Sequence, residues 1–430
     1  MTRMFLAAAL FLGLFLTSMV RAQVPARPAA RGEYLARAAD CVACHSVAGG
    51  KAFAGGLKMG TPLGNIYSTN ITPDRETGIG AYTLEDFDRA LRRGIAPDGH
   101  RLYPAMPYPS YARLTDEDVR ALYDFFMQSV PAVRQANQAN EIPKYLSARW
   151  PLAIWNVLFT GGTGFTPDPR HDAQWNRGAY LVEGVGHCGA CHTARGWAWQ
   201  EVAFDAGDPR FLAGANLDGW YASNLRQNLA TGLGQWSSAE IVQFLKTGHN
   251  ERSSAFGSML DVVNNSTPYI TDEDLDAIAI YLKSLPASAV EPAYAYDPAT
   301  ARALQDGAAE SSGAALYAGN CQNCHRENGG GAPPFIPSLA GNPVMLDKDA
   351  SSLVNITLNG SSPLAPGGVP DAYRMPQFRE QLSDRQIADL VTFIRGAWGN
   401  RAAAVSAREV ADLRKSTDPT SDQVVILKMR

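Results

Sequence analysis

The residues best suited to chemistry form three Cys-x-x-Cys-His pentapeptides. They use all six cysteines of the 430-residue chain. The motif residues are Cys41, Cys44 and His45; Cys188, Cys191 and His192; and Cys321, Cys324 and His325. At this spacing two thiols can bond to the two vinyl groups of one porphyrin, while the next imidazole binds the iron. The sequence therefore predicts three covalently attached haem c groups.

Other uses of paired cysteines explain the pattern less well. A single pentapeptide could belong to a zinc site, and cysteine pairs could form a disulfide framework or thioredoxin-like redox centres. Neither the framework nor the redox pairs explain a histidine after every second cysteine. A chain of this size also has no need of disulfides for stability.

The sixth iron ligand decides whether a haem is open to small molecules or acts as an electron carrier. Each repeat has a methionine shortly before its last helical pattern: Met106, Met259 and Met375. We predict these as the distal ligands, with His45, His192 and His325 as the proximal ones. A thioether is a soft, neutral ligand that favours ferrous iron and raises the reduction potential.

Other methionines and histidines are alternative candidates for the distal positions or are expected to have other roles. Met59 and Met345 are possible substitutes, and His249 competes with Met259, but none of them shares the repeated position. Met127 lies within a helical pattern and is expected to fill the core. Surface or hydrogen-bonding roles are expected for the remaining histidines, which are His100, His171 and His187.

The elements that must position these residues also occur three times. A short helical lead precedes each motif, at 31–35, 177–181 and 313–317. A longer amphipathic helix ends each repeat, with Thr115, Thr271 and Ser383 as N-caps and Asp118, Asp274 and Gln386 as their capping-box partners. Between them, Asn70-Ile71, Asn224-Leu225 and Asn355-Ile356 form a weaker echo. The expected fold is mainly α, as three tandem domains similar to class I cytochrome c, each with one haem.

The repeat sets the expected domain limits. We call 23–140, 176–290 and 308–400 the first, second and third modules. The segments 141–175 and 291–307 are expected linkers, and 401–430 is an expected C-terminal tail. In the first linker, Trp150, Trp155 and Phe159 indicate packing against another surface.

The first 22 residues have the pattern of a secretory signal. A basic start at Arg3 precedes an apolar run from Met4 to Val20 and a small-residue cleavage site ending at Ala22. Export to the periplasm agrees with haem attachment, which occurs outside the cytoplasm; an uncleaved anchor is the alternative. Loss of Arg3 and Arg21 would change the formal net charge from −4 to −6. Nucleic acid is therefore not an expected partner.

Four phrases resemble a known family: 67–74, 102–108, 175–184 and 397–400. They are similar to the triple-haem cytochrome c subunits of bacterial membrane-bound dehydrogenases, which serve gluconate, alcohol and aldehyde dehydrogenases. The resemblance implies a large partner subunit with flavin, pyrroloquinoline quinone or a molybdenum cofactor, and possibly a small subunit. It also implies membrane association and electron delivery to ubiquinone.

Three functions fit these features to different degrees. An electron-transfer subunit is favoured because the chain has no dinucleotide fingerprint and no catalytic constellation of its own, so no catalytic residue is expected. A free-standing multihaem carrier is the first alternative. A haem peroxidase or reductase with one open haem is the second, and one methionine per haem argues against it.

Overall fold

Helices make up most of the regular secondary structure, which agrees with the predicted mainly α class. The computed structural model describes residues 28–420, except 62, 363 and 367–372. The predicted signal segment lies outside the described residues. Within them, no helix has both the length and the apolar character needed to cross a membrane.

The first module contains five helices and a hairpin. The helices are α1 (Pro28–Ala38), α2 (Cys41–Cys44), α3 (Leu84–Arg93), α4 (Tyr108–Tyr111) and α5 (Asp116–Gln128). The antiparallel strands β1 (Lys58–Thr61) and β2 (Gly64–Tyr67) place Met59 opposite Ile66. Two further elements lie in the expected linker: η1 (Lys144–Leu146) and α6 (Pro151–Phe159).

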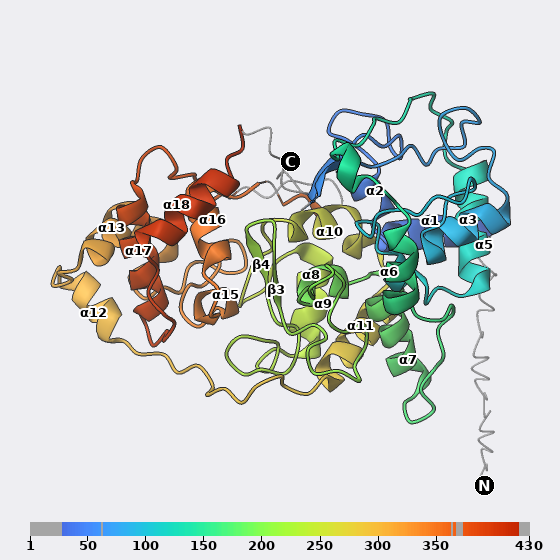
Figure 1. Ribbon diagram of the computed structural model, residues 1–430. Coiled ribbons are helices and arrows are strands. Elements are labelled where there is room, and N and C mark those ends of the chain that lie inside the picture. The colour runs from blue at the N-terminus through green and yellow to red at the C-terminus, as the bar shows by residue number, and fades with distance from the viewer. Residues whose placement is uncertain (1–27, 62, 363, 367–372, 421–430) are drawn as a thin grey trace, which may run out of the picture.

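The second module repeats this plan between the other two modules (Figure 1). Its helical elements are α7 (Ala173–Ala179), the π-helical η2 (Tyr180–Val185), α8 (Gly189–His192), α9 (Ser238–Thr247), α10 (Met259–Asn265), η3 (Thr267–Tyr269) and α11 (Asp272–Ser284). Its hairpin consists of β3 (Ala215–Leu217) and β4 (Trp220–Ala222).

The third module follows a chain segment that leads to α12 (Ala299–Gln305). Its helices are α13 (Ser312–Asn320), α14 (Gln322–His325), α15 (Pro343–Leu346), α16 (Ser351–Asn359) and α17 (Asp384–Gly396). The echo at Asn355-Ile356 lies within α16, whereas the two earlier echoes lie outside helices. The third echo is therefore not structurally equivalent to the others.

One helix pair frames each module, and a glycine permits its close crossing. The pairs are α1 with α5, α7 with α11, and α13 with α17. A Cβ atom at Gly32 or Gly178 would lie 2.0 Å from the carbonyl oxygen of Ala121 or Ala277, respectively. The third crossing has the same geometry at Gly313. Because real Cβ atoms do not approach so closely, the three crossings require glycine.

The helices that end the three modules, α5, α11 and α17, begin at the predicted N-caps. Of these three helices, only α17 has the predicted capping box. Ser383 and Gln386 make both reciprocal bonds. Thr115 and Thr271 cap α5 and α11, but their backbone N–H groups instead point to tyrosine hydroxyls of the neighbouring module. The assignment of Asp118 and Asp274 as capping-box partners was therefore wrong, because their carboxylates bind arginine and tyrosine side chains.

The first two modules share one hydrophobic core. A single cluster contains buried residues from both, among them Leu35, Val119, Leu181 and Leu275. The third module has a separate cluster around Trp398. Burial of apolar surface therefore unites the first two modules more closely than it unites either with the third.

Hydrogen bonds and a small apolar cluster, in which Leu364 packs with Leu260 and Val263, join the second and third modules. The Tyr221 N–H donates to Ser352 Oγ at 2.9 Å, and that hydroxyl donates to the Tyr221 carbonyl at 3.0 Å. Asn355 donates to the Gly219 carbonyl at 3.0 Å. These bonds join the β3–β4 hairpin to α16.

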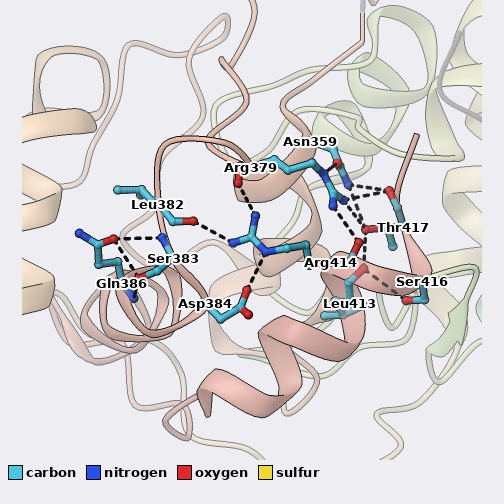
Figure 2. Close-up of polar contacts among 10 residues, drawn as sticks. All are labelled: Asn359, Arg379, Leu382, Ser383, Asp384, Gln386, Leu413, Arg414, Ser416 and Thr417. Carbon is cyan, nitrogen blue, oxygen red and sulfur yellow. Dashed lines mark hydrogen bonds and ion pairs between the residues drawn. The ribbon is translucent and has the colours of Figure 1, made fainter. Parts of the chain in front are cut away.

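Part of the expected C-terminal tail packs on the third module. It forms α18 (Ala407–Ser416), whose Val410 is completely buried. Arg414 donates to Asp384 at 2.7 Å and to the Leu382 carbonyl at 2.8 Å (Figure 2). Arg379 in turn donates to the Arg414 carbonyl at 2.7 Å. The hydrogen bonds of these two arginines hold α18 against the start of α17 and the segment before it.

Candidate haem sites

Four of the five residues of each pentapeptide form a single helical turn. The histidine N–H donates to the carbonyl of the first cysteine in every copy: His45 to Cys41 at 3.0 Å, His192 to Cys188 at 3.0 Å and His325 to Cys321 at 2.9 Å. One turn therefore brings both cysteines and the histidine of each motif together. The structure thus gathers the nine predicted attachment residues into three local groups.

The imidazole of each motif is held by a backbone carbonyl. The Nδ1 atoms of His45, His192 and His325 lie 2.7, 2.6 and 3.1 Å from the carbonyl oxygens of Thr69, Ser223 and Pro337, respectively. In the tautomer in which Nδ1–H donates to the carbonyl, the Nε2 lone pair can bind a metal. Burial also lowers the pKa of all three imidazoles, which favours this neutral form.

Sequence reasoning did not identify the three carbonyl groups. A backbone oxygen has no side-chain signature, because any residue type can supply it. Two of the acceptors, Thr69 and Ser223, do stand immediately before the echoed Asn-Ile and Asn-Leu pairs. That repetition was the available signal, and it fails in the third module, where the acceptor is Pro337.

The first cysteine of each motif does not have the lowered pKa of a redox-active thiol. Burial raises the pKa of the first cysteine in each motif, Cys41, Cys188 and Cys321, to about 12. Reactive cysteines in Cys-x-x-Cys redox centres instead have lowered pKa values. Among the described residues, which include all six cysteines, no disulfide occurs. The raised pKa values do not favour thiol–disulfide exchange at these three residues.

The third module contains a cavity beside its motif. Its volume is about 60 Å³, which is smaller than most small-molecule and cofactor sites. Cys321, His325 and Met375 line it together with apolar side chains such as Leu353 and Ile394. A mostly apolar wall with one imidazole and two thioethers is chemically suited to a haem.

This cavity does not by itself choose between the two methionines of its module, because both line it. Met375 is held by hydrogen bonds with Ser361: its N–H donates to Ser361 Oγ at 2.9 Å, and its carbonyl accepts the Ser361 N–H at 3.0 Å. Met345 is buried on the short helix α15 and belongs to the core cluster. The assignment of Met375 as the ligand stays a prediction.

The other two predicted distal methionines are partly buried and pack against hydrophobic clusters. Met106 is partly buried and packs against the core shared by the first two modules. Met259 is the first residue of α10 and packs against a small cluster containing Leu260 and Val263. Met59 is buried in the β1–β2 hairpin.

The remaining histidines make local contacts. His100 lies 2.6 Å from Asp98, and His171 stacks on Trp175. Nε2 of His187 lies 3.2 Å from the Ala39 carbonyl, so this residue bridges the first two modules. The ring of His249 lies 5.5 Å from that of Phe335, at the border of the third module.

Comparison with known proteins identifies the family. Residues 29–130 and 311–398 match the cytochrome c family. The chain is 50% identical over 392 residues to the gluconate 2-dehydrogenase cytochrome c subunit of Pantoea cypripedii, covering 90% of this chain and 89% of the relative. This chain belongs to the family of dehydrogenase cytochrome c subunits. The resemblance inferred from the sequence is thereby confirmed.

Further members show the breadth of the family. The cytochrome c subunit of alcohol dehydrogenase (quinone) from Gluconacetobacter polyoxogenes is 50% identical over 399 residues, covering 91% of this chain and 85% of the relative. A diheme cytochrome c-type protein of Cereibacter sphaeroides is 36% identical over 267 residues, covering 60% of this chain and 86% of the relative. As a cytochrome c family member, this subunit binds haem c covalently and has an electron-transfer role.

Proposed function

We propose that this cytochrome passes electrons from a substrate-oxidising dehydrogenase subunit through three haem c groups to ubiquinone, on the periplasmic side of the bacterial cytoplasmic membrane. The observation that carries the proposal is the threefold occurrence of one arrangement. In each copy, a Cys-x-x-Cys-His turn presents an imidazole whose Nδ1 is hydrogen-bonded to a backbone carbonyl.

Each module's own residues would hold one haem. The two cysteines of each motif would form the thioether bonds, and His45, His192 and His325 would supply the proximal nitrogen. Met106, Met259 and Met375 would supply the distal sulfur. When bound in this way, a haem provides reversible one-electron oxidation and reduction.

The second module is the important case, because the family match does not cover it. Its motif nevertheless has the same turn, the same carbonyl contact at Ser223 and the same glycine-dependent helix crossing at Gly178 as the other two modules. These repeated features support a haem in all three modules.

The names of the relatives support the proposed partners. Gluconate 2-dehydrogenase and alcohol dehydrogenase (quinone) each include a cytochrome c subunit. We infer a large partner subunit that oxidises a sugar acid, alcohol or aldehyde on flavin, pyrroloquinoline quinone or a molybdenum cofactor, possibly with a small subunit. This chain would then contribute electron transfer and no substrate catalysis.

Affinity capture after gentle detergent extraction of native membranes tests the complex. Gluconate, ethanol and acetaldehyde are added separately to the captured material, and haem reduction is followed by absorbance. Rapid reduction by one substrate is the expected result. Capture of an isolated cytochrome that none of the three reduces would favour a free-standing carrier.

A haem count tests the three sites separately from the partner. Alkaline pyridine treatment and absorbance, divided by protein concentration, should give three haems per chain. Replacement of both Cys188 and Cys191 by alanine should give two. An unchanged count in this variant would contradict a haem in the second module.

A further inference from the structure

Helix α6 has its apolar side chains directed to solvent. Its buried position is Asn156, whereas Ile154, Val157 and Leu158 are exposed, with Val157 83% accessible. A surface helix of a globular protein normally buries its apolar side and exposes its polar side. The inversion indicates that this apolar surface has a binding role.

Specific hydrogen bonds fix the helix in this orientation. The Tyr108 hydroxyl donates to Asn156 Oδ1 at 2.8 Å, and Asn156 Nδ2 donates to the Arg93 carbonyl at 2.8 Å. Trp155 Nε1 donates to the Ala198 carbonyl at 2.8 Å. The exposed apolar side therefore results from a polar anchor on the opposite side of α6.

A loop of the second module extends the same surface. Trp197 is 85% exposed, and its ring lies 6.3 Å from that of Phe159 on α6. Trp199 from the same loop and Trp150 beside α6 are also exposed. We call the exposed residues Trp150, Ile154, Val157, Leu158, Trp197 and Trp199 the tryptophan face.

The two chain segments that form this face contain basic but no acidic residues. Between positions 142 and 167 the sequence contains Lys144 and Arg149 but no aspartate or glutamate, although the whole chain has a formal net charge of −4. The loop 193–200 also has no acidic residue. An anionic surface would therefore meet basic residues and no repelling carboxylate within these two segments.

We propose that the tryptophan face binds the interface of a phospholipid bilayer that contains anionic headgroups. Tryptophan is enriched where the acyl chains meet the headgroups. The nine-residue helix α6 is only about 13 Å long, so it can lie in the interface but cannot span the bilayer. This inference deepens the proposed function, because it rests on a cytochrome that works at a membrane.

The placement of α6 also relates the bilayer to the first module. Tyr108, which binds Asn156, lies two residues after Met106. Arg149 stacks on Tyr103 of the same loop at 4.3 Å. Binding through the tryptophan face would therefore hold the distal loop of the first module directly behind the lipid-bound helix.

Vesicle flotation with the haem-loaded full chain tests the proposal, with haem absorbance as the readout. Vesicles of phosphatidylglycerol and phosphatidylethanolamine should carry the wild-type protein upward. The double variant Val157→Glu and Leu158→Glu should bind about tenfold more weakly, because two charges enter the apolar contact. Trp197→Ser should also weaken binding and tests the loop independently of α6.

Val290→Glu is the matched control, because Val290 is fully exposed outside the tryptophan face. It should float like the wild type. Equal flotation of the wild type and the α6 double variant would overturn the proposal. If the double variant floats unchanged but no longer binds the dehydrogenase partner, the tryptophan face binds that partner and not lipid, which would also overturn the proposal. Substrate-driven haem reduction in captured, detergent-solubilised complexes is measured separately. It should survive in the double variant, so a failure of lipid binding can be distinguished from a failure of the proposed function.

Discussion

Tyr34 of the first module donates its hydroxyl hydrogen to Asp274 of the second at 2.5 Å, and the reverse pair joins Tyr180 to Asp118 at the same distance. Each carboxylate also binds an arginine of its own module: Arg177 binds Asp274, and Arg31 binds Asp118. The two modules are thus joined by an exchange of equivalent residues, as in a symmetric dimer. A shared core and this reciprocal exchange make the first two modules a single structural unit.

Replacement of Tyr34 by phenylalanine should loosen this unit. The change leaves Asp274 without one partly buried donor, so the free energy of unfolding should fall by about 1–3 kcal/mol. Tyr180→Phe should have a similar effect at the equivalent contact. Denaturant titration followed by circular dichroism measures both variants. Tyr296→Phe, at an exposed tyrosine, is the control; a loss at Tyr34 no larger than the loss at Tyr296 would contradict the role of the exchange.

The same contact should make stability dependent on pH in the acid range. Burial alone would raise the pKa of Asp274, but hydrogen bonds from Arg177 and Tyr34 outweigh it and lower the pKa below the ordinary value. Because the folded pKa lies below the unfolded value of about 3.9, the stabilisation is present above that pH and is lost as pH falls through the folded pKa. Asp274→Asn should remove this contribution.

Thermal unfolding between about pH 2 and pH 7 compares the wild type with Asp274→Asn. The difference in melting temperature between the two proteins should shrink below about pH 4, where the wild-type carboxylate becomes protonated. A difference that stays constant across this range would show that Asp274 does not contribute through its charge.

The helix crossings give a prediction with a control on the same helix. A Cβ at Gly313 would lie 2.2 Å from the Asp389 carbonyl oxygen, whereas a Cβ at Gly319 would meet no atom within 4 Å. Gly313→Ala should lower the free energy of unfolding by about 1–3 kcal/mol or more, because α13 must move away from α17. Gly319→Ala should leave it unchanged or slightly raised. Equal effects in denaturant titrations would refute the close-packing role of Gly313.

Local elements could be predicted from the sequence, whereas contacts between modules could not. Capping patterns and apolar spacing located the last helix of each module, because both signals are local. Asp118 and Asp274 stand where capping-box partners normally stand, so no sequence pattern indicates that each binds an arginine and a tyrosine more than 60 residues away. The motif residues were predictable because covalent attachment fixes their spacing. The carbonyl acceptors were not, because backbone atoms carry no residue signature.

The two methionines that line the cavity of the third module should respond differently to substitution. Met375 lies in a non-helical segment held by Ser361, at the position shared by the predicted ligands, whereas Met345 is buried in the core. Met375→Ala should open one iron, so that carbon monoxide binds to one ferrous haem per chain. Met345→Ala should leave carbon monoxide binding unchanged but lower the free energy of unfolding by about 2–5 kcal/mol, as expected for a truncated core side chain.

Carbon monoxide titration of the dithionite-reduced proteins, followed by absorbance, measures the first effect, and denaturant titration measures the second. The wild type is the reference for both measurements. If Met345→Ala opens a haem while Met375→Ala does not, the ligand lies on α15 and the shared position does not determine ligation. If neither variant binds carbon monoxide, another residue closes the iron. If the wild type itself binds carbon monoxide promptly, an open haem exists and the chain is more than an electron carrier.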